Sequence, residues 1–141
     1  MQIPMNDYRW DDLTLGMSAQ FETQVTPDLM TAFANLSGDI NPLHMDEEFA
    51  QKAGFPGRVV FGMLTASFYS RLIGVYLPGK RALLDGIDLE FKSPAYIGDR
   101  LTVSGEIAFL NDTYHRCEIK ARIRNAAGQL ISKATIRAGV K

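Results

Sequence analysis

The sequence contains almost no cysteine: Cys117 is the single one among 141 residues. One cysteine excludes an intramolecular disulfide and a cysteine-rich zinc site, and it is typical of proteins from a reducing compartment. Histidine is nearly as rare, because His44 and His115 are its two occurrences, so a histidine-based metal site is poorly supported. We therefore expect no metal ion and no cofactor.

An excess of charge of one sign is also missing, since 15 basic and 16 acidic residues leave a formal net charge of -1. This balance offers no broad basic face for nucleic acid, although a small basic pocket for one phosphorylated ligand stays open. The apolar run at 59–77 is short for a membrane span of about 20 residues and is interrupted by Arg71. Residues 1–15 carry several charges and no apolar core of a signal peptide. We expect a cytoplasmic protein without nucleic acid or membrane partners.

The composition, with 46% hydrophobic and 22% charged residues, is typical of a globular protein. A chain of 141 residues fits one ordinary domain, and no repeat, linker or low-complexity tract divides it. Nucleotide-binding, zinc-protease and serine-hydrolase motifs are absent. The prediction is a single domain over residues 1–141.

The first half of the chain alternates a strand with short helices. Residues 18–25 predict a strand, and Thr26-Pro27-Asp28 is typical of a helix start. That helix would place three apolar side chains on one face, namely Leu29, Phe33 and Leu36. Turn-forming residues at 37–42 predict a loop, and Asp46 can cap a second short helix that closes at 54–57.

The segment 62–76 predicts a helix buried on nearly every side, because apolar and small residues surround it and Arg71 is its only charge. Pro78-Gly79 would end this helix. Apolar and polar residues then alternate, which predicts strands with one wet and one buried face. These strands would form an antiparallel meander over 83–93, 100–110, 114–125 and 129–138.

Asp39 and His44 flank a rigid Asn41-Pro42 turn just before a capped helix. A carboxylate and an imidazole held together can move protons at neutral pH. The alternative is that Asp39 stabilises an Asx-turn and His44 is an ordinary surface or core histidine. Spacing alone leaves both interpretations open.

Gly62 begins the predicted buried helix. The first N–H groups of a helix have no partner within it and carry the positive end of its dipole. Without a Cβ, Gly62 would let a thioester carbonyl approach these groups and gain stabilisation as an enolate forms. The alternative is that the glycine only permits tight packing at a helix start.

Three segments together resemble a known family. They are Ser37-Gly-Asp39-Ile-Asn41-Pro42-Leu43-His44-Met-Asp46, Val60-Phe61-Gly62-Met63-Leu64 and Phe91-Lys92-Ser-Pro94-Ala-Tyr-Ile-Gly98-Asp99. Their order and spacing are similar to those of the MaoC-like (R)-specific enoyl-CoA hydratases, from about Leu15 to the last strand. The resemblance implies an α+β hot dog fold, in which an antiparallel sheet wraps around a long central helix. It also implies a homodimer joined sheet edge to sheet edge, which would cover an exposed edge strand.

The resemblance implies that Asp39 and His44 form the catalytic pair that holds the attacking water, and that the N–H of Gly62 is the oxyanion donor. Ser70 matches a serine of the family that would orient the catalytic carboxylate, and Ser67 is a weaker candidate for that role. Asn41 belongs to the motif and would brace its loop.

The chain departs from the family pattern at Phe61, where a histidine most often precedes the glycine. A phenyl ring there would narrow or dry the mouth of the pocket and favour an unusual acyl chain, or would be a neutral replacement. Both readings stay open. Asp46 is assigned to helix capping and not to chemistry.

The expected function is hydration of trans-2-enoyl thioesters to (R)-3-hydroxyacyl thioesters, or the reverse dehydration, on coenzyme A. The first alternative is a 3-hydroxyacyl-[acyl carrier protein] dehydratase of fatty acid or polyketide and polyene synthesis. A thioesterase and a noncatalytic acyl-binding module are further alternatives, although the loop histidine argues against a thioesterase. The candidates for contact with either carrier are basic: Arg58, Lys80, Arg81 and Lys92.

Overall fold

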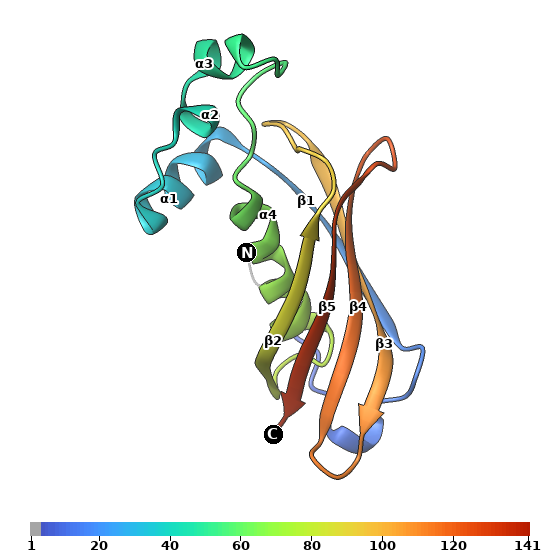
Figure 1. Ribbon diagram of the computed structural model, residues 1–141. Coiled ribbons are helices and arrows are strands. Elements are labelled where there is room, and N and C mark those ends of the chain that lie inside the picture. The colour runs from blue at the N-terminus through green and yellow to red at the C-terminus, as the bar shows by residue number, and fades with distance from the viewer. Residues whose placement is uncertain (1–3) are drawn as a thin grey trace.

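Five antiparallel strands form one curved sheet around a helix, as the computed structural model of the chain shows for residues 4–141 (Figure 1). The strands are β1 (Ser18–Gln24), β2 (Ala82–Phe91), β3 (Arg100–Asn111), β4 (Arg116–Asn125) and β5 (Leu130–Val140). Their order across the sheet is β1-β3-β4-β5-β2. This α+β arrangement is the hot dog fold implied by the resemblance. The first three residues of the predicted single domain lie outside the described range.

The helices follow local signals in the sequence. After the short 3-10 helix η1 (Trp10–Asp12) come α1 (Pro27–Ser37), α2 (Pro42–Met45), α3 (Glu47–Lys52), α4 (Gly62–Arg71) and the π-helix η2 (Leu72–Tyr76). The hydroxyl of Thr26 accepts the N–H of Leu29 at 3.2 Å, and Asp46 Oδ1 accepts the N–H of Phe49 at 3.1 Å. Both predicted caps are therefore confirmed.

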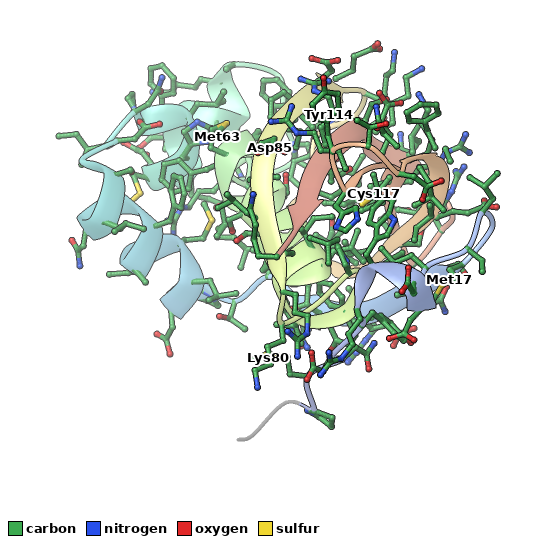
Figure 2. The ribbon with its side chains drawn as sticks, turned by 90° about the horizontal axis from the view of Figure 1, so that it is seen from below. Met17, Met63, Lys80, Asp85, Tyr114 and Cys117 are labelled. Atoms are coloured by element: carbon green, nitrogen blue, oxygen red, sulfur yellow. The ribbon has the colours of Figure 1, made fainter. Side chains whose placement is uncertain are left out.

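The core lies between the inner face of the sheet and α4. In β4 the apolar side chains that alternate with charged ones are buried, namely Cys117, Ile119, Ala121 and Ile123. Cys117 lies inside the curve of the sheet (Figure 2). The period-two prediction is confirmed for this strand.

The predicted strand order was wrong for β2. It pairs with β5 along its length, from Ala82 opposite Val140 to Phe91 opposite Ser132, and does not form a hairpin with β3. The edge of β3 that a hairpin would use is taken by β1, where Phe21 lies opposite Val103. Only β3, β4 and β5 form a meander among the described strands.

Burial was overestimated on one side of the molecule. Met63 on α4 is 62% exposed, and Ile87 and Phe91 on β2 are 39% and 52% exposed. Leu36, expected on the buried face of α1, is 84% exposed, and Met30 and Ala34 are buried in its place. For Met63, Ile87 and Phe91 the reason is that β2 is an edge strand and that no segment within residues 4–141 covers the adjoining side of α4.

The segment α1 to α3 projects beyond the sheet on the side where α4 begins (Figure 1). None of the helices within residues 4–141 is long and apolar enough to cross a membrane. Because this projecting segment carries Asp39 and His44, it brings the predicted catalytic motif next to the start of α4.

Candidate active site

The motif between α1 and α3 is built by short local hydrogen bonds. Gly38 ends α1 with a left-handed φ of 76°. The carboxylate of Asp39 then accepts the N–H of Asn41 at 3.0 Å, and Asn41 Oδ1 accepts the N–H of Leu43 at 2.9 Å. Asn41 thus caps α2 and braces the turn, in agreement with its predicted role. His44 lies on this one-turn helix and not on the predicted loop, because Pro42 and the Asn41 cap start a helix there.

His44 is held at several atoms. Its backbone N–H donates to the carbonyl of Asn41 at 2.9 Å, and its Nδ1 lies 2.8 Å from the carbonyl oxygen of Val59. A carbonyl can only accept, so Nδ1 carries the ring proton in this contact. The ring centroid also lies 4.4 Å from that of Phe61. Nε2 is consequently the ring nitrogen that is left to accept a hydrogen bond from a ligand.

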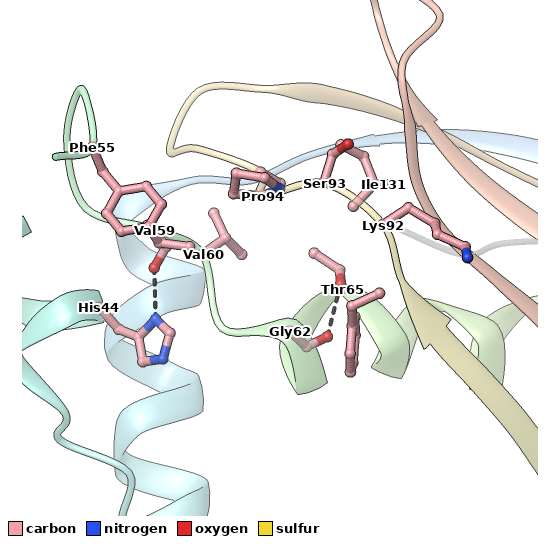
Figure 3. A pocket seen from close by; sticks show the side chains of 12 residues that line it. His44, Phe55, Val59, Val60, Gly62, Thr65, Lys92, Ser93, Pro94 and Ile131 are labelled. Carbon is pink, nitrogen blue, oxygen red and sulfur yellow. Dashed lines mark hydrogen bonds between the residues drawn. The ribbon is translucent and has the colours of Figure 1, made fainter. Parts of the chain in front are cut away.

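A pocket of about 360 Å³ lies between His44, the start of α4 and the segment that follows β2. His44 and Gly62 lie along one side of it, and Ser93 and Pro94 lie across from them (Figure 3). Most of the remaining lining is apolar. It is formed by Phe55, Val59, Val60, Thr65, Phe91, Lys92, Ala95 and Ile131.

Gly62 is the first residue of α4. Its carbonyl accepts the hydroxyl of Thr65 at 2.7 Å, while its N–H has no acceptor among residues 4–141. An unpaired N–H at a helix start beside a pocket can bind a substrate oxygen. A Cβ at this position would lie 3.0 Å from Phe91 Cε1, so tight packing is a second reason for the glycine.

Asp39 and Ser70 are not joined in the single chain. Both are exposed, and within the described part of the chain no hydrogen bond links Asp39 to Ser70 or to His44. The hydroxyl of Ser67 donates back to the carbonyl of Leu64 at 2.6 Å. The roles inferred for these two serines therefore remain predictions.

Ser70 lines a second, apolar cavity of about 260 Å³ between α4 and β2. Met63, Leu84 and Ile87 also line it. Met63 and Ile87 belong to the exposed side described above, and Leu84 on β2 is 50% exposed as well. Ile136 of β5 adds to its lining. The cavity therefore lies where α4 and the edge strand are left uncovered.

The four basic candidates separate into two groups. Lys92 lines the pocket beside His44, and Arg58 donates from Nε to the carbonyl of His44 at 2.7 Å. Arg81 pairs with Asp7 at 2.7 Å, and Lys80 is exposed beside it after the far end of the central helix. The structure thus brings two of the four to the candidate site.

Sequence reasoning missed the residues that hold His44 in place. The carbonyl of Val59 and the guanidinium of Arg58 both reach it from the segment between α3 and α4. A backbone carbonyl leaves no mark in a sequence, and Arg58 looked like a ligand for phosphate. The contacts exist because Val59 N–H also donates to the carbonyl of Leu43 at 3.1 Å, which holds the segment against α2.

The pocket thus combines a hydrogen-bond acceptor, His44 Nε2, with a free donor, the N–H of Gly62, between apolar walls. The N–H donor of such a pair can bind and polarise the carbonyl oxygen of a ligand, while the imidazole acceptor takes part in a proton transfer beside it. Among the described residues there is no cluster of three or more His, Cys, Asp or Glu side chains that could hold a metal ion.

Comparison with known proteins places these features in a family. The family model described as "MaoC like domain" matches residues 13–126. The (R)-specific enoyl-CoA hydratase of Aeromonas caviae is 37% identical over 118 residues, which cover 84% of this chain and 88% of that protein. A mitochondrial 3-hydroxyacyl-[acyl-carrier-protein] dehydratase of Arabidopsis thaliana is 40% identical over 100 residues, which cover 70% of this chain but 59% of that protein.

A solved structure gives the same result for the fold. The (R)-hydratase from A. caviae, described as involved in PHA biosynthesis, superposes with a TM-score of 0.88 at 34% sequence identity. The match covers 92% of this chain and 98% of the other. The five-stranded sheet and its central helix are therefore shared over nearly the whole of both chains.

Proposed function

Since the chain belongs to the MaoC-like domain family, we propose that it catalyses reversible hydration of trans-2-enoyl thioesters to (R)-3-hydroxyacyl thioesters. The observation that carries the proposal is that His44 and the free N–H of Gly62 line one pocket. The first can accept a hydrogen bond from water, and the second can hold the thioester oxygen. The A. caviae relative, named for this activity, supports the reaction class.

In the proposed hydration, Asp39 takes one proton of the attacking water and His44 Nε2 accepts the hydrogen bond of the other. The water oxygen bonds to Cβ, the double-bond electrons move toward the thioester oxygen, and Gly62 N–H stabilises the enolate. The proton then passes to Cα, so the atoms of water are added across the double bond. Dehydration follows the same steps in reverse.

We propose that the active form is a homodimer. The side of the chain formed by Met63, Leu84, Ile87 and Phe91 is exposed and apolar, and β2 presents an unpaired edge. A second copy pairing along β2 would cover both features and close the open side of the 260 Å³ cavity. The enclosed cavity is a suitable place for an acyl chain.

Coenzyme A is the proposed carrier, because the A. caviae relative is an enoyl-CoA hydratase and the match covers most of it. The alternative is an acyl carrier protein, which the Arabidopsis relative supports. Lys92 at the pocket would serve either carrier. Comparing turnover of one acyl chain on both carriers separates them. The free buried thiol of Cys117 supports a reducing compartment, and we propose the cytoplasm.

The test follows loss of enoyl absorbance when the purified protein meets a short trans-2-enoyl-CoA, with chiral analysis of the product. We expect (R)-3-hydroxyacyl-CoA, and we expect Asp39→Asn to lower kcat by about 10² to 10⁴. Asp46→Asn is the matched control, because Asp46 lies in the same segment, and asparagine caps a helix as well as aspartate does.

Four outcomes would contradict the proposal. An (S) product would overturn the stereochemistry, and release of free thiol would indicate a thioesterase. Full activity of Asp39→Asn would remove Asp39 from the mechanism. Absence of activity on both carriers would leave the acyl-binding module as the better reading.

A further inference from the structure

Phe61 is the residue at which the chain departs from the family pattern, and it packs directly against His44. We propose that Phe61 is a positioning residue for His44: together with the carbonyl of Val59 it fixes the imidazole plane and keeps the neutral ring protonated on Nδ1. Nε2 is then always the acceptor that faces the substrate. This inference rests on the proposed function for its catalytic meaning.

The packing leaves the two rings little freedom. Phe61 is 1% exposed, and its ring centroid lies 4.4 Å from that of His44 at an interplanar angle of 33°. Phe33 also packs against Phe61, with 4.9 Å between the ring centroids. Because the phenyl ring is buried among these neighbours, it cannot easily make way for His44, and rotation of the imidazole would break the 2.8 Å contact with Val59.

The same residue also holds the donor of the site. The backbone carbonyl of Phe61 accepts the N–H groups of Leu64 and Thr65 at 3.1 and 3.2 Å, which starts α4 at Gly62. Phe61 therefore touches His44 with its side chain and fixes the first turn of α4 with its backbone. Phe61 thus contributes to the placement of both His44 Nε2 and Gly62 N–H, together with the carbonyl of Val59.

A phenyl ring suits the task because it has no hydrogen-bonding atom. A histidine at this place would bring ring nitrogens beside His44 and offer its proton a second partner. Beside a phenyl ring, the carbonyl of Val59 is the acceptor that selects the tautomer. With phenylalanine in place of histidine, the carbonyl oxygen of Val59 therefore determines which ring nitrogen of His44 carries the proton.

Nitrogen NMR tests the inference directly, because His44 and His115 are the two histidines of the chain. Long-range ¹H–¹⁵N correlation at about pH 8, where most histidine side chains are neutral, distinguishes the two tautomers. Assignment follows from the signal lost in His115→Gln. We expect wild-type His44 to be protonated on Nδ1. Protonation on Nε2 in the wild-type protein would overturn the inference whatever any variant shows.

Phe61→Leu then tests the side chain itself. We expect the Nε2-protonated form of His44 to become populated, and kcat to fall about 3- to 10-fold with KM little changed, since ground-state binding does not use the ring. Phe21→Leu is the matched control, because Phe21 is another buried phenyl with an aromatic neighbour, Tyr76, at 5.2 Å. It lies on β1 and does not touch His44.

The outcomes separate the two proposals. If Phe61→Leu keeps the wild-type tautomer of His44, the positioning role fails, whatever the activity. If Phe61→Leu and Phe21→Leu change the His44 signals equally, the effect is general loosening of the core and the positioning role also fails. If the signals respond as expected but no hydratase activity exists, the positioning role stands and the proposed function fails.

Discussion

Replacing Gly62 with alanine separates the two reasons for a glycine at the start of α4. The new methyl carbon would lie 3.0 Å from Cε1 and 3.1 Å from Cζ of Phe91. Carbon atoms prefer about 3.5 to 4.0 Å, so the phenyl ring must move by roughly 0.5 Å. The atoms in contact are at the far end of the Phe91 side chain, which can shift by this amount, while alanine favours the helix by up to about 1 kcal/mol over glycine. We expect a change in Tm of a few degrees at most.

The effect on activity should be much larger. Gly62 and Phe91 both line the pocket, so the methyl group points to the place where a thioester oxygen would reach the N–H. Loss of one oxyanion donor costs about 10² to 10³ in kcat, and we expect Gly62→Ala to approach that range. Steady-state kinetics on a trans-2-enoyl-CoA, together with thermal unfolding of the same sample, measures both quantities.

Gly74→Ala is the control for this experiment, because a Cβ at Gly74 meets nothing within 4 Å. It should change neither activity nor Tm appreciably. If Gly62→Ala keeps wild-type kcat, the oxyanion assignment is wrong and tight packing explains the glycine. If it unfolds the protein, the estimate that Phe91 can move is wrong.

Three further predictions concern the interface and the core. Ile87→Asp places a charge on the exposed apolar side and should shift the protein from dimer to monomer in sedimentation. Asp88→Asn should not, because the Asp88 side chain pairs with Arg137 on the outer face of the sheet. A monomeric wild type would refute the dimer. Tyr69→Phe and Ser132→Ala each remove one partner of a buried 2.8 Å hydrogen bond, and each should lower the free energy of unfolding in urea by about 1 to 2 kcal/mol. The double variant should lose less than the sum of the two, and strict additivity would contradict this. Burial raises the pKa of Cys117 to about 11, so the stability that the buried thiol contributes is present below the pKa of the unfolded thiol and is lost as pH rises toward 11. Cys117→Ala should flatten this alkaline decline in the free energy of unfolding, and an unchanged slope against pH would refute the prediction.

Features set by near neighbours in the chain could be predicted from the sequence. Thr26 and Asp46 cap their helices as expected, and in the turn between β4 and β5 Asn125 Oδ1 accepts the N–H groups of Ala127 and Gln129. In each case one side chain bonds to backbone a few residues away. Such contacts depend on local sequence and little else.

The place of β2 could not be predicted in this way. Its alternating pattern shows a strand but does not say which partner it takes, and the pairing with β5 is decided by the whole sheet. The exposure of Ile87 and Met63 could not be predicted either, because an alternating pattern does not say whether a strand lies at the centre or at the edge of a sheet. The pattern of apolar residues therefore overstated how much of the single chain is buried.

The sequence singled out candidate residues for the site, but it did not show what holds them in place. The resemblance implied that Asp39 and His44 form an acid–base pair, which stays a prediction, and Phe61 stood out as a departure from the family. His44 lies on α2 and bonds to Val59 because the segment before α4 folds back against that helix. A contact to the backbone carbonyl of a residue far along the chain cannot be predicted from residue types, because every residue has such a carbonyl.

The pairing of β2 with β5 also delays completion of the sheet until β5 has been synthesised. β2 leaves the ribosome before β3, β4 and β5, yet its hydrogen-bonding partner is the last strand of the chain. Until the residues near Val140 emerge, β1, β3 and β4 can pair, but β2 has no neighbouring strand to join it to the sheet. A prematurely terminated chain is thus a target for chaperones and proteases and not a smaller working protein.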